Sequence, residues 1–248
     1  MQDKTFRLYE SDVLRLTTGD TLRPGGFSLT DLGVKHCDFL PGARVLDLGC
    51  GNGATVDRLV SLYQLRAVGL DRSERLLGLG AQKNPSLNLI LGVGENLPFK
   101  ANHMDGIFAE CTLSVMEDLE QVLKEIFRVL KPGGWLVIND VYARNPEGLK
   151  PLQELNLDSC IRRALPKESL INQLVEHGFS IDYWSDHTNL LTQLMVNLIM
   201  THGSMTEFWL ISSSCSGSFD PSLVQAAMKQ AKMGYFQLIA QKDAVSEE

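Results

Sequence analysis

The chain has 248 residues, of which 44% are hydrophobic and 21% are charged, and its formal net charge is −7. Such a composition is typical of a globular protein that is long enough to bury one sizeable core, and we expect one domain. The net negative charge argues against a broad nucleic-acid-binding face, because the neutralisation of phosphates requires clustered lysines and arginines. We therefore expect no nucleic-acid partner.

We expect no signal for export, no membrane insertion and no structural metal. The N-terminal stretch "MQDKTFRLYESDV" lacks an apolar signal-peptide region. The most apolar segment, "NLLTQLMVNLIM", is interrupted by polar residues and is shorter than the ~20 residues of a membrane-spanning helix. The 5 cysteines form no CxxC pair, so we predict no metal site. We expect a cytoplasmic protein without a membrane partner, whose cysteines are reduced.

Residues 1–43 are expected to form a loop and a helix, with turn signals at "TGDTLRPGGFS". From residue 44 to residue 141, short apolar runs alternate with amphipathic segments. The runs "ARVLDLG", "RAVGLD", "LNLILG", "MDGIFAE" and "GWLVIND" are predicted strands, and "ATVDRLVSLY", "SERLLGLGAQ" and "LEQVLKEIFRVL" are predicted helices. This alternation predicts an α/β fold with a mostly parallel sheet and helices on both faces. Such sheets bind ligands beyond the carboxyl ends of their strands.

The rhythm changes after residue 141. Residues 142–166 are irregular, and "KESLINQLVEHGF" reads as a helix with a glycine stop. "SIDYWSDH" and "GYFQLIAQK" are predicted strands, whereas "NLLTQLMVNLIMTHGSMTEFWLI" is predicted as one long helical stretch and "PSLVQAAMKQAKM" as a helix. We expect residues 142–166 and 187–233 to form a helical cap on the core, and residues 1–43 to form a lid.

The run "VLDLGCGNG" joins the first predicted strand to a helix through Gly49, Gly51 and Gly53. Glycines permit a positive φ and a close approach of a ligand to the backbone. The run satisfies a loose dinucleotide-binding pattern, but Asp47 would repel a pyrophosphate and attract a cofactor that carries an ammonium and a sulfonium. Asp71 ends the second strand, where a carboxylate can accept both ribose hydroxyls. The alternative, that both acids are only caps, is less favoured.

Four features together resemble the class I methyltransferases that use S-adenosylmethionine, of the methyltransferase-11 type. They are "VLDLGCGNG", "GLDRS", "GENLPF" and "VLKPGGWLVIND", which lie within residues 40–140. The resemblance implies a Rossmann-like, doubly wound, mostly parallel seven-stranded sheet with a helical cap insertion. It also implies S-adenosylmethionine as the cofactor, S-adenosylhomocysteine as the product, a small-molecule substrate, and a monomer or homodimer.

The resemblance further implies the residues that contact the cofactor. The first loop would lie under its methionine part, the acid after the second strand would bind its ribose, and "GENLPF" would border its adenine. Val93 stands where the family commonly has an aspartate that accepts a bond from the adenine amino group, so backbone contacts are expected there instead. The implied contacts are Asp47, Gly49, Cys50, Gly51, Asp71, Arg72, Gly94, Glu95, Asn96, Glu110 and Cys111.

A shaped loop, "LRPGGFS", precedes the first strand and contains Arg23. In methyltransferases of this class the corresponding segment often folds over the cofactor, and a lid excludes water and aligns the methyl group. A guanidinium can bind a carboxylate through two parallel hydrogen bonds. Arg23 is therefore a candidate to bind the cofactor's carboxylate or an anionic substrate, and an exposed turn is the equal alternative.

Three further stretches, "ECTLSV", "NDVY" and "CIRRAL", resemble arsenite methyltransferases. In that family two late cysteines bind a trivalent metalloid as thiolates, which here implies Cys160 and Cys215. Val56 stands where those enzymes have another cysteine, and Arg163 stands where they have a glycine. A complete three-thiol site is not predicted, and buried packing is an equal alternative for both cysteines.

We thus expect a methyltransferase that acts on a small molecule, with a thiol or metalloid acceptor left open. Glu110, Cys160 and Cys215 are the catalytic candidates, and an oxygen or nitrogen acceptor would need a base such as Glu110, His187 or His202. A non-catalytic, cofactor-binding partner subunit and an arsenite methyltransferase proper remain alternatives. Asp47 and the four matching features disfavour a nicotinamide-dependent dehydrogenase.

Overall fold

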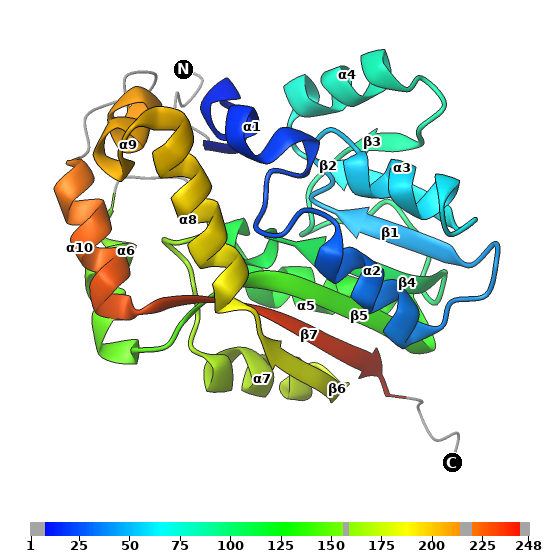
Figure 1. The fold of residues 1–248 in the computed structure, drawn as a ribbon. Helices are drawn as coiled ribbons and strands as arrows, with labels where there is room; N and C mark the ends of the chain where they lie inside the picture. The colour runs from blue at the N-terminus through cyan, green and yellow to red at the C-terminus, as the bar shows by residue number, and fades with distance from the viewer. Residues whose placement is uncertain (1–7, 156–158, 214–219, 244–248) are drawn as a thin grey trace, which may run out of the picture.

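The structure is a computed structural model that describes residues 8–155, 159–213 and 220–243 (Figure 1). Within them, one seven-stranded sheet has the strand order β3-β2-β1-β4-β5-β7-β6. Only β7 runs antiparallel to its neighbours, so the expected mostly parallel sheet is confirmed. The strands are β1 (Arg44–Leu48), β2 (Arg66–Asp71), β3 (Leu89–Leu91), β4 (Met104–Glu110), β5 (Leu130–Ala143), β6 (Phe179–Asp186) and β7 (Met233–Lys242).

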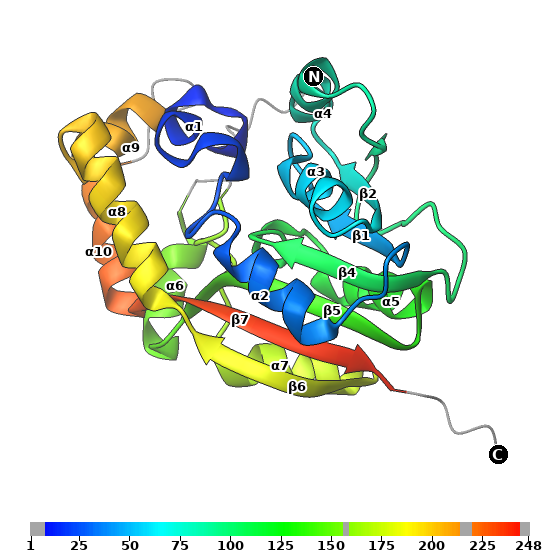
Figure 2. The ribbon, with the colours of Figure 1, turned by 45° about the vertical axis from the view of Figure 1, so that its right-hand side comes forward.

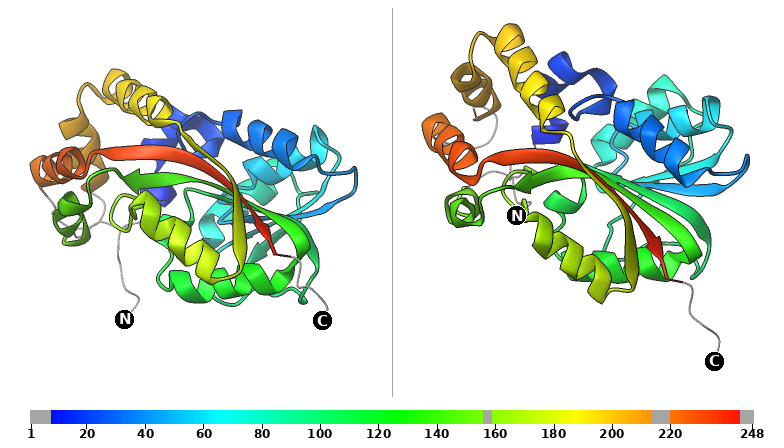
Figure 3. Two further views of the ribbon diagram at one scale, coloured as in Figure 1. Left: turned by 90° about the horizontal axis from the view of Figure 1, so that it is seen from below. Right: turned by 60° about the horizontal axis from the view of Figure 1, so that its bottom comes forward.

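Helices cover both faces of this sheet (Figure 3). On one face α2 (Ser28–Cys37), α3 (Ala54–Ser61) and α4 (Glu74–Lys83) pack against strand residues such as Val45. On the other face α5 (Leu119–Val129) and α7 (Lys167–Glu176) pack against residues such as Leu46. Consecutive strand residues point to opposite faces, and both of these are fully buried. This explains why the central strands are apolar throughout rather than alternating.

A separate group of helices packs beside the carboxyl end of β5 (Figure 2). It combines helices from residues 142–166 and 187–233, the predicted cap, with one helix from residues 1–43. They are α1 (Asp12–Thr18), α6 (Leu149–Gln153), α8 (Thr188–His202), α9 (Met205–Ser213) and α10 (Pro221–Ala231). The expectation of one long helix over α8 and α9 was wrong. Gly203 has a φ of +89°, which ends α8 and turns the chain into α9. Among the described residues, every helix is too short or too polar to cross a bilayer.

The segment before β1 is more structured than the sequence suggests. It contains the short 3-10 turns η1 (Leu8–Glu10) and η2 (Gly19–Thr21) as well as α1 and α2. Helix α1 packs against α8 of the cap, whereas α2 packs on the sheet. The N-terminal segment therefore connects the cap with the core, and the residues between α1 and α2 pass over the carboxyl ends of the central strands (Figure 1).

Candidate active site

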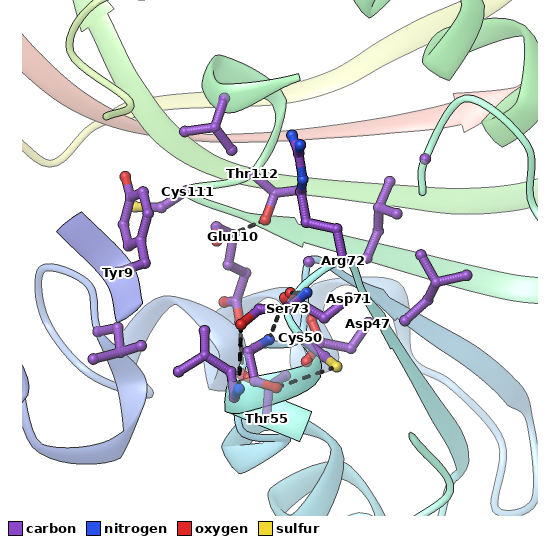
Figure 4. Close-up of a pocket in the computed structure, with 18 of the residues that line it drawn as sticks. Tyr9, Asp47, Cys50, Thr55, Asp71, Arg72, Ser73, Glu110, Cys111 and Thr112 are labelled. Atoms are coloured by element: carbon purple, nitrogen blue, oxygen red, sulfur yellow. Dashed lines mark hydrogen bonds between the residues drawn. The ribbon is translucent and has the colours of Figure 1, made fainter. Parts of the chain in front are cut away.

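A cleft lies at the carboxyl ends of β1, β2 and β4, where a ligand site is expected in this kind of sheet (Figure 4). It encloses about 1120 Å³ between its walls, with open solvent at its mouth included. Acidic groups, glycine backbone and apolar side chains share its lining. The predicted site residues in this lining are Arg23, Asp47, Gly49, Cys50, Gly51, Asp71, Arg72, Gly94, Glu95, Glu110 and Cys111.

The glycine loop after β1 forms the floor of the cleft. Gly49, Gly51 and Gly53 all have a positive φ, which glycine adopts without steric cost. A Cβ at Gly49 would lie 2.6 Å from Cγ2 of Thr112, so the loop after β4 packs directly on this glycine. The N–H groups of Gly49 and Cys50 donate to the carbonyl of Leu70, at distances of 2.8 and 3.1 Å. These bonds fix the loop against the end of β2.

Two buried carboxylates flank this loop, at the ends of β1 and β2. Asp71 accepts hydrogen bonds from the N–H of Gly51 (2.7 Å) and the N–H of Ser73 (2.8 Å). It therefore stabilises both the glycine loop and the start of α4, and it also lines the cleft. Burial raises the pKa of Asp71 above its usual value, and burial followed by the proximity of Glu110 raises that of Asp47 well above it.

Glu110, at the end of β4, forms a buried ion pair with Arg23. The Arg23 Nη2 atom lies 2.8 Å from Oε2 of Glu110, and both side chains are nearly inaccessible to solvent. Hydroxyls of Thr30 and Thr55 also donate to this carboxylate, at 2.7 and 2.9 Å, as does Nδ2 of Asn139, at 2.8 Å. Arg23 and Glu110, which were both expected to contact ligands, thus form an ion pair with each other.

The Arg23–Glu110 pair belongs to a larger polar network under the cleft. Asn139 on β5 accepts a bond from Nε2 of Gln237 on β7 (2.9 Å), and the same amide donates to the carbonyl of Leu29 in α2 (2.7 Å). All of these side chains are buried. The network connects the N-terminal segment with β4, β5 and β7, so Arg23 is part of a fixed wall.

The loop after β4 forms another wall of the cleft. Cys111 has a φ of +53°, which is uncommon for a residue other than glycine. Its Sγ lies 3.6 Å from the hydroxyl of Tyr235, and burial raises the pKa of the thiol well above its usual value. The turn η3 (Leu113–Val115) follows, and Met116 reaches the cleft beside Gly94.

Cys160 lies behind the wall that contains Cys111 and is not part of the cleft lining. Its N–H donates to the hydroxyl of Tyr9 (3.2 Å), and Tyr9 itself lines the cleft. Burial raises the pKa of the Cys160 thiol to about 12. Cys215 lies outside the described residues, and the described part of the chain contains no cluster of three or more potential metal ligands. The structure therefore lends no support to a metalloid site of neutral-pH thiolates.

At the opposite end of the cleft, Val93 is 45% exposed and provides an apolar surface beside Gly94 and Glu95. Arg72 lines this end and lies 3.4 Å from Glu117 in an exposed ion pair. Asn96 is exposed and is not among the residues that line the cleft. Its N–H donates back to the carbonyl of Val93 in a turn (3.3 Å), so a cofactor contact by its side chain gains no support.

Several residues that line the cleft were not predicted, because the motifs in the sequence assign no ligand contact to them. Tyr9, Asp20, Thr55, Thr112 and Met116 all line the cleft. They come from four separate segments of the chain, and only the fold brings them together. His187 and His202, considered as bases, are not in this lining, and burial lowers the pKa of His187.

Residues 46–138 match the methyltransferase domain family. The chain is 30% identical over 156 residues to the 2-phytyl-1,4-naphtoquinone methyltransferase of Synechococcus elongatus, which covers 60% of this chain and 66% of that protein. It is 28% identical over 174 residues to the sterol 24-C-methyltransferase of Schizosaccharomyces pombe, covering 64% of this chain. The chain spans only 44% of the length of this second relative.

Solved structures share the fold over most of the chain. The [4+2]-cyclase SpnF is 25% identical, with a TM-score of 0.68 over 87% of this chain and 81% of that one. A phosphoethanolamine N-methyltransferase of Haemonchus contortus, in complex with S-adenosyl-L-methionine, is 18% identical, with a TM-score of 0.69 over 94% of this chain and 56% of that one. With the glycine loop and its flanking acids in place, residues 46–138 of the chain belong to the methyltransferase domain family, of the class I type.

Proposed function

We propose that the protein transfers the methyl group of S-adenosylmethionine to a small molecule and releases S-adenosylhomocysteine. One observation carries this proposal. Asp47, Asp71 and Glu110 converge around the glycine loop at the carboxyl edge of the sheet. Their negative potential attracts a cofactor with an ammonium and a sulfonium, and it repels the pyrophosphate of a nicotinamide dinucleotide.

In this proposal the cofactor lies along the cleft, with its methionine part over Gly49 and Gly51. Each oxygen of Asp71 already accepts one backbone N–H, and each has a second lone pair that can accept a ribose hydroxyl. Val93 and Met116 provide apolar contacts for the adenine, and the backbone of Gly94 and Glu95 supplies polar ones.

Arg23 and Glu110 support the cofactor site through their charge and position. Glu110 accepts bonds from three side chains besides its ion pair, so a role in removing a proton from the acceptor is disfavoured. Its charge, partly balanced by Arg23, remains close to the place of the sulfonium. Arg23 donates to Thr30 and Thr55 at 2.8 and 3.0 Å, which keeps the N-terminal segment closed over the cleft.

The chemical step is an in-line displacement. S-adenosylmethionine, held by Gly49, Gly51 and Asp71, would supply a methyl group on an activated sulfonium. The lone pair of the acceptor would form a bond to the methyl carbon as the carbon–sulfur bond breaks and its electron pair goes to sulfur, which would leave a neutral thioether. An acceptor with a hydrogen on its nucleophilic atom would lose that proton to solvent or to a base. The protein accelerates this step chiefly by proximity and orientation.

The acceptor that best suits the other end of the cleft is uncharged and largely apolar. Tyr9, Cys111 and Thr112 meet there, and burial raises the pKa of the first two well above their usual values, so both are neutral at pH 7. The relatives named for sterol and naphthoquinone methylation point to the same class of acceptor. A metalloid acceptor receives less support, because metalloid binding requires thiolates.

Calorimetry with S-adenosylmethionine, S-adenosylhomocysteine and the dinucleotide NAD tests the cofactor assignment. We expect binding of the first two and none of the third. Incubation with a methyl-labelled cofactor and a panel of sterol-like, quinone-like, thiol and arsenite acceptors then tests the transfer. Labelling of apolar acceptors supports the proposal, whereas labelling of arsenite alone contradicts the acceptor class.

A different reaction in the same site is the second candidate. The cyclase SpnF shares this fold and 25% of aligned residues, so the fold by itself does not fix the reaction. Tight binding of S-adenosylmethionine without S-adenosylhomocysteine formation on any acceptor would favour a non-transferring role, including that of a cofactor-binding partner subunit.

A further inference from the structure

The loop Thr112–Met116 touches both backbone segments that are proposed to contact the cofactor. At one end, Thr112 packs on Gly49 so closely that a Cβ there would lie 2.6 Å from its Cγ2. At the other end, Cε of Met116 would lie 3.2 Å from a Cβ at Gly94. The position of this loop therefore sets the width of the cleft at the methionine end and at the adenine end together.

Asp140 on β5 supports the first half of this loop from behind. Its Oδ1 accepts a bond from the hydroxyl of Ser114 (2.5 Å), and its Oδ2 accepts one from the N–H of Ser114 (3.1 Å). The N–H of Val141 donates to Oδ1 at 2.8 Å. Asp140 is only 2% exposed and is not part of the cleft lining, so it acts on the cleft through the loop.

Arg163 supports the second half of the loop. Its Nη1 donates to the carbonyls of Val115 and Met116, both at 2.9 Å. Arg163 belongs to the irregular segment between β5 and α7, and with Asp140 and Ser114 it lines a second, smaller cavity behind the loop. Asp140 thus fixes Ser114, and Arg163 fixes the next two residues of the same loop, Val115 and Met116.

We propose that Asp140 and Arg163 are positioning residues that hold the loop Thr112–Met116 against Gly49 and Gly94 in the geometry that binds the cofactor. This inference rests on the proposed function of the cleft. Ser114 and Asp140 are buried, so removal of either partner leaves the other unpaired rather than returned to water, whereas the bonds from Arg163 are partly buried. The loop then shifts to find a new partner, and the cleft changes shape at both ends.

The protonation state of Asp140 supplies a readout that a merely structural residue would lack. Burial raises its pKa to about 6, against the hydrogen bonds from Ser114, Val141 and Thr112 that lower it. The other titratable groups that act on this carboxylate are Tyr9, Cys111 and Cys160, all neutral at pH 7, and Arg163 shares the cavity behind it. Protonation near pH 6 turns one carboxylate oxygen of Asp140 from an acceptor into a donor. This new donor faces the hydroxyl and the N–H of Ser114, which are donors themselves.

The test compares Asp140→Asn with Asp105→Asn by calorimetry with S-adenosylmethionine. Asp105 also accepts a backbone N–H, from Arg44 (2.8 Å), but it lies near the amino end of β4, away from the cleft. We expect the affinity to fall about tenfold in Asp140→Asn, as for the loss of a buried charge-assisted bond, and to change less than about twofold in Asp105→Asn. Below pH 6 the wild type should lose a component of affinity that Asp140→Asn lacks.

Arg163 gives an independent arm that leaves the carboxylate intact, should Asp140→Asn fail to fold. Arg163→Met should weaken S-adenosylmethionine binding about fivefold, whereas Arg163→Lys, which keeps a donor, should recover most of it. A double-mutant cycle with Ser114→Ala shows whether Asp140 acts through the loop. In that case Asp140→Asn lowers the S-adenosylmethionine affinity by a smaller factor in the Ser114→Ala background than in the wild type.

The outcomes separate the two proposals. If the wild type does not bind S-adenosylmethionine, both the proposed function and this inference fall. If the wild type binds but Asp140→Asn and Arg163→Met bind equally well, only the inference falls. Equal losses in Asp140→Asn and Asp105→Asn also overturn it, because they would show a general effect on stability.

Discussion

The two ends of the cleft differ in charge and in how their polar groups are satisfied. Around the glycine loop, Asp47, Asp71 and Glu110 place three carboxylates within mutual electrostatic reach, and Asp71 and Glu110 accept bonds from named donors. Around Tyr9 and Cys111 the polar groups are phenols and thiols that burial keeps neutral. Figure 4 shows Tyr9 beside Cys111 at one end, Asp47 and Asp71 at the other, and Glu110 between them.

This difference matches the two partners of a methyl transfer. The charged end suits a cationic cofactor, and its geometry is fixed before any ligand arrives, so little reorganisation is needed on binding. The neutral end can desolvate an apolar acceptor without leaving a buried charge unpaired. The four predictions below test whether the ends are as distinct as their chemistry indicates, and they run from the largest expected effect to the smallest.

The packing of Thr112 on Gly49 gives the largest effect on cofactor affinity. Gly49→Ala should weaken S-adenosylmethionine binding by about 100-fold or more, because the new methyl adds a clash to the ~1–2 kcal/mol cost of a positive φ. Gly19→Ala is the matched control, since Gly19 has a φ of +64° and open space around its Cβ direction. Calorimetry on both variants separates the clash from the backbone strain. Normal binding by Gly49→Ala would contradict a cofactor that passes over this loop.

Removal of the Glu110 charge gives the largest effect on stability. Glu110→Gln leaves the Arg23 guanidinium buried without its counter-charge, and we expect the free energy of unfolding to fall by about 3–5 kcal/mol. In the double variant Arg23→Met/Glu110→Gln the buried charge is gone, so much of that loss should be recovered. Urea denaturation measures both. If the double variant is no more stable than Glu110→Gln alone, the ion pair is not the source of the stability.

The acidic end should also make cofactor affinity depend on pH. Burial raises the pKa of Asp47 and of Asp71, so both carboxyls stay protonated to a higher pH than in free solution. A cation binds the deprotonated carboxylates, so the affinity for S-adenosylmethionine should rise as the pH increases through the pKa values of Asp47 and Asp71. Each carboxylate should raise the affinity by about tenfold for every unit by which the bound cation lowers its pKa. Raised pKa values have the opposite effect on the free energy of unfolding. A carboxyl whose pKa is raised in the folded protein stabilises the fold at low pH, where it is protonated, and this contribution is lost as the pH rises. For Asp140 it is lost between pH ~4 and about 6.

Calorimetry in two buffers of different ionisation enthalpy checks this prediction, since binding should release protons. Asp47→Asn should bind more weakly at pH 8 and should show a flatter pH profile. S-adenosylhomocysteine lacks the sulfonium, so its affinity should depend less steeply on pH. A flat profile for S-adenosylmethionine in the wild type would remove the electrostatic distinction between the two ends.

The sequence predicts the charged end far better than the neutral end. The glycine loop, Asp47 and Asp71 lie in short local motifs whose chemistry depends on adjacent residues, and the alternating strands and helices around them were predicted correctly. The partners of Glu110 could not be predicted in this way. Arg23, Thr55 and Asn139 are separated from it by 87, 55 and 29 residues, and only the closure of the N-terminal segment over the sheet brings them together.

The neutral end depends on contacts that no local pattern encodes. At the neutral end Tyr9 reaches Cys160 across 151 residues of sequence, and at the adenine end Arg163 reaches Met116 across 47. At position 163 the sequence has an arginine where arsenite methyltransferases have a glycine, and in the structure this arginine donates to two backbone carbonyls. The cap was predicted as helical, but the break between α8 and α9 required the positive φ of Gly203 to be recognised as a stop.

Cys160 gives the smallest expected effect and the sharpest contrast with the acidic end. With a pKa of about 12, its thiolate fraction at pH 7 is roughly 1 in 10⁵, too small for a nucleophile or a soft-metal ligand without a strong perturbation on binding. Cys160→Ser should change S-adenosylmethionine binding and methyl transfer to apolar acceptors by less than about twofold. Cys160 should also react slowly with iodoacetamide at pH 7, as peptide mapping of the labelled protein would show. Rapid labelling, or loss of transfer in the serine variant, would mean that a ligand or a motion of Tyr9 lowers this pKa, and the metalloid acceptor would then return as the better candidate.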